Sequence, residues 1–92
     1  MEYRDNTTSL LNRIERIPEG YSIGNYGNRS YGITKTIFNR GKSYKVFAEE
    51  LGGKDFISLN FYSTNSNDLL KPCEMPKQKV IHFLQNVIIK DN

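Results

Sequence analysis

The sequence predicts an α+β domain: a short N-terminal helix, a four- to five-stranded antiparallel meander sheet, and a C-terminal amphipathic helix packed on one face. Two aromatic-rich runs flank a Gly-Gly turn, which is typical of a hairpin. Short connections between the apolar runs favour antiparallel neighbours. Apolar residues recur at helical spacing near both ends. The 92 residues form a single domain, 1–92, with a helix at 6–17, an antiparallel sheet at 20–71 and a helix at 76–90.

The expected first helix begins near Asn6, Thr7 or Thr8, whose side-chain oxygens can cap free backbone N–H groups. Its apolar stripe consists of Leu10, Leu11, Ile14 and Ile17. Pro18 ends it, because the residue before a proline is disfavoured in helical conformation. A helix this short is expected to form only where it packs against the sheet.

The central part of the chain reads as strands joined by short turns. The expected strands are 21–26, 29–38, the two arms of the hairpin 44–62, and 69–71. The expected turns are Gly27-Asn28, Asn39 to Lys42, Gly52-Gly53 and Thr64 to Asp68. Gly24 indicates a bulge in the first strand. The final helix follows Pro76 and runs from Lys77 to Ile89. Its apolar stripe consists of Val80, Phe83, Leu84, Val87 and Ile88.

Alternation along the hairpin 44–62 divides its side chains between two faces. One face carries Tyr44, Val46, Ala48, Ile57, Leu59 and Phe61. The opposite face carries Lys45, Phe47, Glu49, Phe56, Ser58, Asn60 and Tyr62. Since the apolar face must be covered by the helices, the second face is expected to face outward with its aromatic rings exposed.

An outward face that combines aromatic rings with lysines suits a single-stranded nucleic acid, because bases stack on rings and ammonium groups bind phosphates. The candidate residues are Arg29, Lys35, Arg40, Lys42, Lys45, Phe47, Asn60 and Tyr62. Of these, Lys45, Phe47, Asn60 and Tyr62 are expected on the face itself, and the other four at or near turns that could rim it. Two alternative roles stay open for this face. The cross-strand pairs could serve only to stabilise the sheet, or a second subunit could cover them.

The composition sets further limits. The net charge of +3 is compatible with a nucleic-acid partner but does not require one. No apolar run approaches the roughly 18 residues of a membrane span, and the chain opens without a charged and then apolar leader. A single cysteine favours a reducing compartment, so a cytoplasmic location is expected.

Other chemistry-bearing residues give weaker indications. Cys73 precedes the last helix, where a thiol could be activated as a nucleophile or lie half-buried at a strand-to-helix junction. His82 is expected on a solvated helix face, and one histidine with one cysteine cannot supply a tetrahedral zinc site. The glycines form no phosphate-binding pattern. Glu49 and Glu50 point to opposite faces of a strand and cannot share a proton. We therefore expect no cofactor and no metal.

Two family resemblances add expectations. The run from Tyr31 to Leu84 contains KVFAEELGGKDFISLNFY, LLKPCEMP and KVIHFL, and it resembles a group of small uncharacterised bacterial proteins often labelled peptide methionine sulfoxide reductase. That resemblance implies a redox enzyme in which Cys73 attacks the sulfoxide sulfur. The order of elements from Arg29 to Ile89 is similar to the transcriptional positive coactivator four family. That second resemblance implies a dimer that binds single-stranded DNA on basic and aromatic strands.

The function favoured by these observations is a small non-enzymatic binding domain, bacterial or phage-encoded. It would bind single-stranded DNA or RNA through the aromatic and basic face, as a homodimer. The first alternative is the Cys73-dependent redox enzyme. A second alternative is a protein-binding inhibitor or adaptor that uses an exposed sheet edge.

Overall fold

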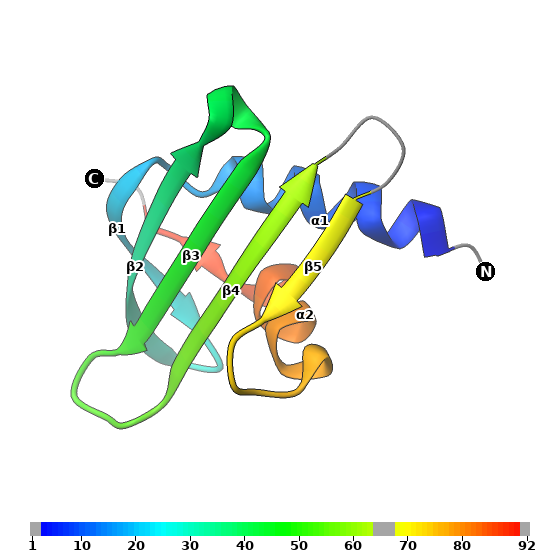
Figure 1. Ribbon diagram of the computed structural model, residues 1–92. Coiled ribbons are helices and arrows are strands. Elements are labelled where there is room, and N and C mark those ends of the chain that lie inside the picture. The colour runs from blue at the N-terminus through cyan, green and yellow to red at the C-terminus, as the bar shows by residue number, and fades with distance from the viewer. Residues whose placement is uncertain (1–2, 64–67, 91–92) are drawn as a thin grey trace.

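The computed structural model describes residues 3–63 and 68–90, with side chains from Leu10 onward. The elements follow the order α1 (Tyr3–Arg16), β1 (Gly20–Tyr26), β2 (Arg29–Phe38), a 3-10 turn η1 (Asn39–Gly41), β3 (Ser43–Glu50), β4 (Phe56–Ser63), β5 (Asp68–Pro72), α2 (Lys77–Asn86) and β6 (Ile88–Ile89). Figure 1 shows both helices behind the sheet. No described helix is long and apolar enough to cross a membrane.

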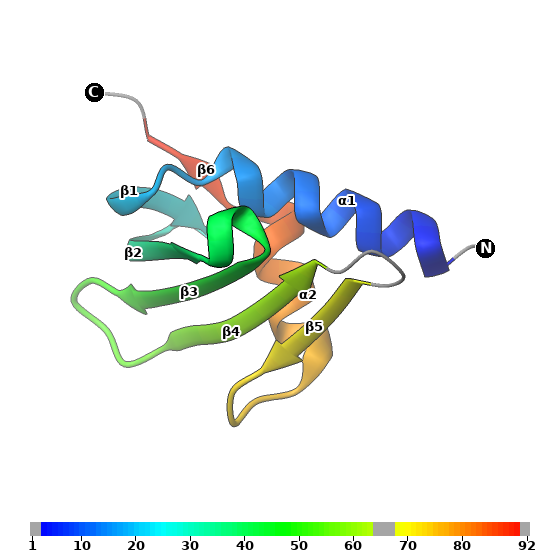
Figure 2. The same ribbon diagram turned by 45° about the horizontal axis from the view of Figure 1, so that its top comes forward.

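The six strands form one sheet in the order β5-β4-β3-β2-β1-β6, with every neighbouring pair antiparallel. Strands β1 to β5 follow one another as a meander, while β6 joins from the end of α2. Turning the molecule shows α1 crossing the strands with α2 beside it, on the same side of the sheet (Figure 2). The α+β prediction is therefore confirmed, although the described sheet has six strands where four to five were expected.

The core lies between the helices and one face of the sheet. Its fully buried side chains are Ile14, Ile17, Ile33, Val46, Ile57, Leu59, Phe61, Val80, Phe83 and Leu84. The predicted apolar stripes of both helices and of the hairpin contribute to this set. Burial of these side chains is the main force that holds the two helices on the sheet, because each contributes on the order of 1.5–3 kcal/mol when it leaves water.

The predicted extension of the last helix to residue 90 is wrong beyond Asn86. Val87 is extended, with φ −69° and ψ 139°, and the next two residues pair with β1, Ile88 with Asn25 and Ile89 with Gly24. Two physical reasons account for this. The outer edge of β1 has backbone groups that need hydrogen-bond partners, and the β-branched run that ends the helix suits a strand. Ile88 consequently leaves the core, with 69% of its surface exposed.

Gly24 does not form the expected bulge, because β1 pairs with β2 without interruption. Its role is to let β6 approach closely. A Cβ atom at this position would lie 3.0 Å from Val87 Cγ2 and 3.1 Å from the Ile88 carbonyl oxygen. The missing side chain therefore makes room for the sixth strand.

The outer edge of β5 is interrupted by Pro72. The Cys73 amide donates to the Ser58 carbonyl oxygen at 3.0 Å, and these two residues are in register with the β4–β5 pairs. Hydrogen-bonded pairs alternate in an antiparallel ladder, so the backbone of Pro72 faces away from β4. Because proline has no N–H, the exposed edge of the sheet lacks a donor at this point.

Candidate nucleic-acid interface

No described helix or strand covers the face of the sheet opposite the helices, and we call it the open face. Cross-strand register arranges its side chains in rows that run across the strands. The first row contains Phe38, Ser43, Tyr62 and Leu69. The second contains Thr36, Lys45, Asn60 and Lys71. The third contains Thr34, Phe47 and Ser58. The fourth contains Gly32, Glu49 and Phe56.

Aromatic rings are exposed in three of these rows. The exposed fraction is 47% for Phe38, 38% for Phe47, 40% for Phe56 and 36% for Tyr62. The rings of Phe47 and Phe56 lie against one another, with centroids 6.2 Å apart. Large apolar side chains gathered on one uncovered surface are characteristic of an interaction site.

The second row places cations between aromatic rows. Lys45 and Lys71 are both exposed and flank Asn60 on the strand between them. Successive rows are two residues apart along a strand, which is about 6.6 Å. Ammonium groups therefore lie one row away from Phe38 and Tyr62 on one side and from Phe47 on the other.

Arg40 and Lys42 lie at the end of the open face, next to its first row. The η1 turn, which contains Arg40 and is followed by Lys42, has left-handed backbone at three successive residues, with φ of 53° at Asn39, 58° at Arg40 and 90° at Gly41. This conformation reverses the chain between β2 and β3. Both cationic residues are exposed, and they lie at the end of β2 and β3, beyond the first row.

Arg29 is not part of this group. It begins β2, at the opposite end of that strand from η1, and its guanidinium pairs with Glu50 Oε2 at 2.9 Å. The expectation that Arg29 joins the other cations is therefore not met by the geometry.

The prediction that Lys35 rims the open face is wrong. Its side chain points to the helix side of the sheet, between the positions of Ile33 and Ile37, and is only 4% exposed. Its Nζ donates to the Ile14 carbonyl oxygen at 3.1 Å and lies 5.7 Å from the centre of the Tyr44 ring. Burial lowers the pKa of Lys35 below its ordinary value.

Lys71, Tyr21, Phe38 and Phe56 lie on the open face but were not among the predicted site residues. Lys71 reaches the second row because β5 pairs in register with β4, and alternation along β5 could have predicted its direction. Tyr21 extends the third row from β1, where it is in register with Thr34. Its ring lies over Gly32, since a Cβ atom on that glycine would approach Tyr21 Cζ to 3.1 Å.

Cys73 lies at the margin of the second row. Its half-buried sulfur is 3.5 Å from the Asn60 side-chain nitrogen. His82 is on the other side of the sheet, at the C-terminal part of α2, so the only cysteine and the only histidine do not form a pair. Among residues 3–63 and 68–90, no three His, Cys, Asp or Glu side chains are grouped so that they could hold a metal ion.

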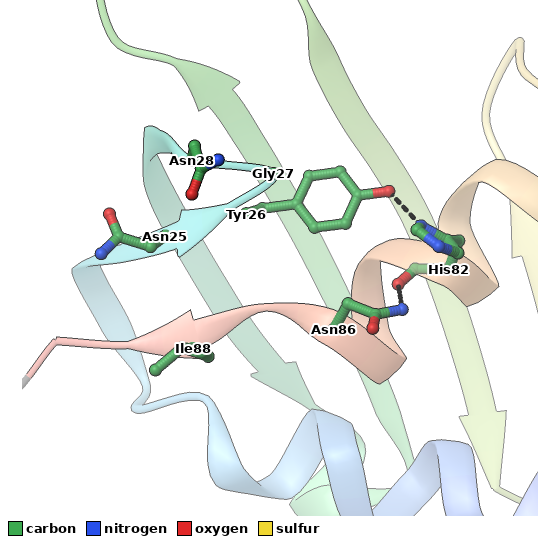
Figure 3. A pocket seen from close by; sticks show the side chains of 7 residues that line it. All are labelled: Asn25, Tyr26, Gly27, Asn28, His82, Asn86 and Ile88. Carbon is green, nitrogen blue, oxygen red and sulfur yellow. Dashed lines mark hydrogen bonds between the residues drawn. The ribbon is translucent and has the colours of Figure 1, made fainter.

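A hollow of about 700 Å³ lies between the β1–β2 turn, α2 and β6. Figure 3 shows its lining residues, Asn25, Tyr26, Gly27, Asn28, His82, Asn86 and Ile88. The Tyr26 hydroxyl is hydrogen bonded to His82 Nδ1, and Asn86 Nδ2 donates to the His82 carbonyl oxygen. Burial raises the pKa of Tyr26. His82 is exposed, as predicted, but it is held by this contact rather than free in solvent.

A second polar cluster joins α2 to the sheet. Asp55 accepts hydrogen bonds from Tyr31 Oη at 2.8 Å and from Lys79 Nζ at 2.6 Å. The bond from Lys79 lowers the pKa of Asp55, and burial together with the bond to Asp55 raises the pKa of Tyr31. These residues anchor the start of the helix to the end of the β3–β4 turn.

Comparison of the chain with protein-family models, with curated proteins and with solved structures found no match. The two resemblances described from the sequence therefore stay predictions.

Proposed function

We propose that this protein is a small cytoplasmic binding domain that holds single-stranded nucleic acid on the open face. The observation that carries the proposal is the second row, in which Lys45 and Lys71 lie between two rows that expose aromatic rings. Bases stack on flat apolar rings, and phosphates bind cations. The three rows present rings, then cations, then rings, which matches the order base, phosphate, base along a single strand.

The dimensions of the face support this assignment. The two aromatic rows lie four residues apart along the strands, or about 13 Å. An extended single strand can therefore stack one base near Phe38 and Tyr62 and another on Phe47, with the intervening backbone over the lysines. Each stacked base contributes about 1–3 kcal/mol. Arg40 and Lys42 supply further phosphate contacts where the strand leaves the first row.

Glu49 limits the extent of the interface. Its carboxylate belongs to the fourth row and repels phosphates, so the proposed site covers the first three rows only. A short oligonucleotide of a few nucleotides is therefore sufficient to fill it.

The test is fluorescence anisotropy with labelled single-stranded oligonucleotides over a series of salt concentrations. Wild-type protein should bind with an affinity that falls as salt rises. The logarithm of the association constant should change with the logarithm of salt by about 0.7 per phosphate contact. Replacing Lys45 and Lys71 together by alanine should lower that slope by about 1.4. Replacing Phe47 by alanine should weaken binding about tenfold while leaving the slope unchanged.

Two matched variants control the experiment. Lys90→Ala removes an exposed cation at the far edge of the sheet, and Ile88→Ala removes an exposed apolar side chain there. Both should bind like wild type. Binding that does not respond to salt, or that responds equally to the control variants, would exclude the open face as a nucleic-acid site.

A further inference from the structure

We infer that the open face also pairs with the open face of a second copy of this chain, and that nucleic acid and the second copy compete for it. This inference rests on the proposed function, because it describes how access to the same site is regulated. The order of side chains on one strand supports it. The exposed residues of β3 are Lys45, Phe47 and Glu49, a cation and an anion placed symmetrically about an aromatic ring.

This order is self-complementary under two-fold symmetry. Consider an axis that passes over Phe47, lies between two facing sheets and runs perpendicular to the strands. It places β3 of one copy antiparallel to β3 of the other, so each Lys45 meets a Glu49 of the second copy. The axis makes two identical ion pairs, as an isologous interface requires. Rotation about an axis parallel to the strands would instead oppose like charges, which disfavours that arrangement.

The surroundings of Phe47 match the centre of such an interface. Its ring packs against Phe56 on β4. On the other side, Phe38 is exposed on the adjacent strand β2 and Tyr21 on β1, two strands away. Two sheets that pack face to face bury aromatic and aliphatic side chains in a layer about 10 Å thick. Pairing of this kind would remove from water the apolar surface that a monomer leaves exposed.

The two partners exclude one another, because both need Phe47 and Lys45. Nucleic acid should therefore convert the paired form into separate protein–nucleic-acid complexes. Glu49 has opposite effects on the two associations. It attracts Lys45 of the second copy and repels phosphate, so it favours the pair over the complex.

Variants that reverse the charges of Lys45 and Glu49 test the inference, and sedimentation analysis of the full chain measures their oligomeric state. Wild type should form dimers. Lys45→Glu alone and Glu49→Lys alone each oppose like charges twice, and each should weaken self-association by about tenfold or more. An equal mixture of the two single variants should restore dimers as a hybrid pair. The double variant K45E/E49K should also be dimeric. Lys90→Glu, which changes a charge away from the face, should behave as wild type.

Addition of oligonucleotide to the wild-type dimer should release protomers. A wild type that is monomeric throughout, or single variants that dimerise like wild type, would overturn the inference. The proposed function has a separate readout, since Glu49→Lys should be monomeric and should bind oligonucleotide more tightly than wild type. A monomeric Glu49→Lys variant that binds no oligonucleotide would overturn the nucleic-acid site and leave the pairing intact. Circular dichroism of each variant checks that the fold is unchanged.

Discussion

The ammonium group of Lys35, in the middle of β2, lies 3.1 Å from the carbonyl oxygen of Ile14 in the last turn of α1. A cation at the C-terminal end of a helix interacts favourably with the helix dipole. The Ile14 carbonyl oxygen also accepts from the Ile17 amide at 3.1 Å, so Lys35 adds a second hydrogen bond to it. The same side chain is buried in the core, where a charge is costly. The contact therefore joins α1 to the sheet, but it requires the ammonium group of Lys35 to lose its hydration.

Replacing Lys35 by methionine should keep the free energy of unfolding at neutral pH within about 1 kcal/mol of wild type, because a buried charge can be exchanged for an apolar side chain of similar size. Lys35→Ala should lower it by about 2 kcal/mol or more, since it leaves a cavity. Urea denaturation measures both. The affinity of the methionine variant for oligonucleotide should equal that of wild type. A clear loss of affinity would show that Lys35 takes part in binding.

Lys35 should also give a pH dependence. Its pKa in the fold is lower than the ordinary value of 10.5, so between the two values the unfolded chain binds the extra proton. Stability contributed by this group should therefore rise with pH through that range. Urea denaturation of wild type and of Lys35→Met over the same range isolates this contribution. An equal slope in the two proteins would contradict it.

Tyr31 should make the protein less stable as pH rises, which is the opposite of the effect expected from Lys35. Its pKa is raised above the ordinary 10.0, so as pH increases past that value the unfolded chain loses its proton first and stability falls. Tyr31→Phe removes the hydrogen bond to Asp55 and should cost about 1 kcal/mol at neutral pH. The variant should also show a smaller decline in stability at alkaline pH. Tyr21→Phe, at an exposed position, is the control and should change neither quantity.

Gly24→Ala should detach β6. The added methyl group would press against Val87 and the Ile88 backbone, and backbone cannot move aside as a flexible side chain can. We expect a loss of about 1–2 kcal/mol in the free energy of unfolding. Hydrogen exchange gives a local readout, because the Lys90 amide donates to the Ile23 carbonyl oxygen across this pair. Unchanged protection of that amide would show that the strand tolerates the methyl group.

Cys73 offers a chemical footprint of the proposed interface. Its sulfur lies beside Asn60, which is between Lys45 and Lys71 in the second row of the open face. A nucleic acid that occupies this row should slow the reaction of the thiol with a small alkylating reagent several-fold. The double variant K45A/K71A, which should bind poorly, is the control and should show little protection. Equal reaction rates with and without oligonucleotide in wild type would place the ligand elsewhere.

Much of this architecture follows from local signals in the sequence. Alternation along β3 and β4 predicted correctly that Ile57, Leu59 and Phe61 are core and that Phe47 and Tyr62 face outward. These predictions succeeded because the two-residue period of a strand fixes the face of every side chain once one face is known to be buried.

The errors arose where the outcome depends on distant parts of the chain. The run after Asn86 fits a helical stripe as well as a strand, and only the free edge of β1 decides between them. Lys35 shares the parity of Ile33 and Ile37, so alternation alone placed it on the core side. Its charge suggested solvent, but the end of α1 supplies a buried acceptor that the sequence of β2 does not reveal.

Pro72 has a consequence for behaviour in concentrated solution. Sheets that add strands along a free edge can grow without limit into fibrils. Here the β5 edge lacks a backbone donor at its end, and the opposite edge is formed by β6, which has only two residues. Among the described residues, neither β5 nor β6 offers a long uninterrupted template for a further strand. Association of this protein should therefore stop at a closed particle of fixed size, and concentrated samples should stay clear instead of forming a gel.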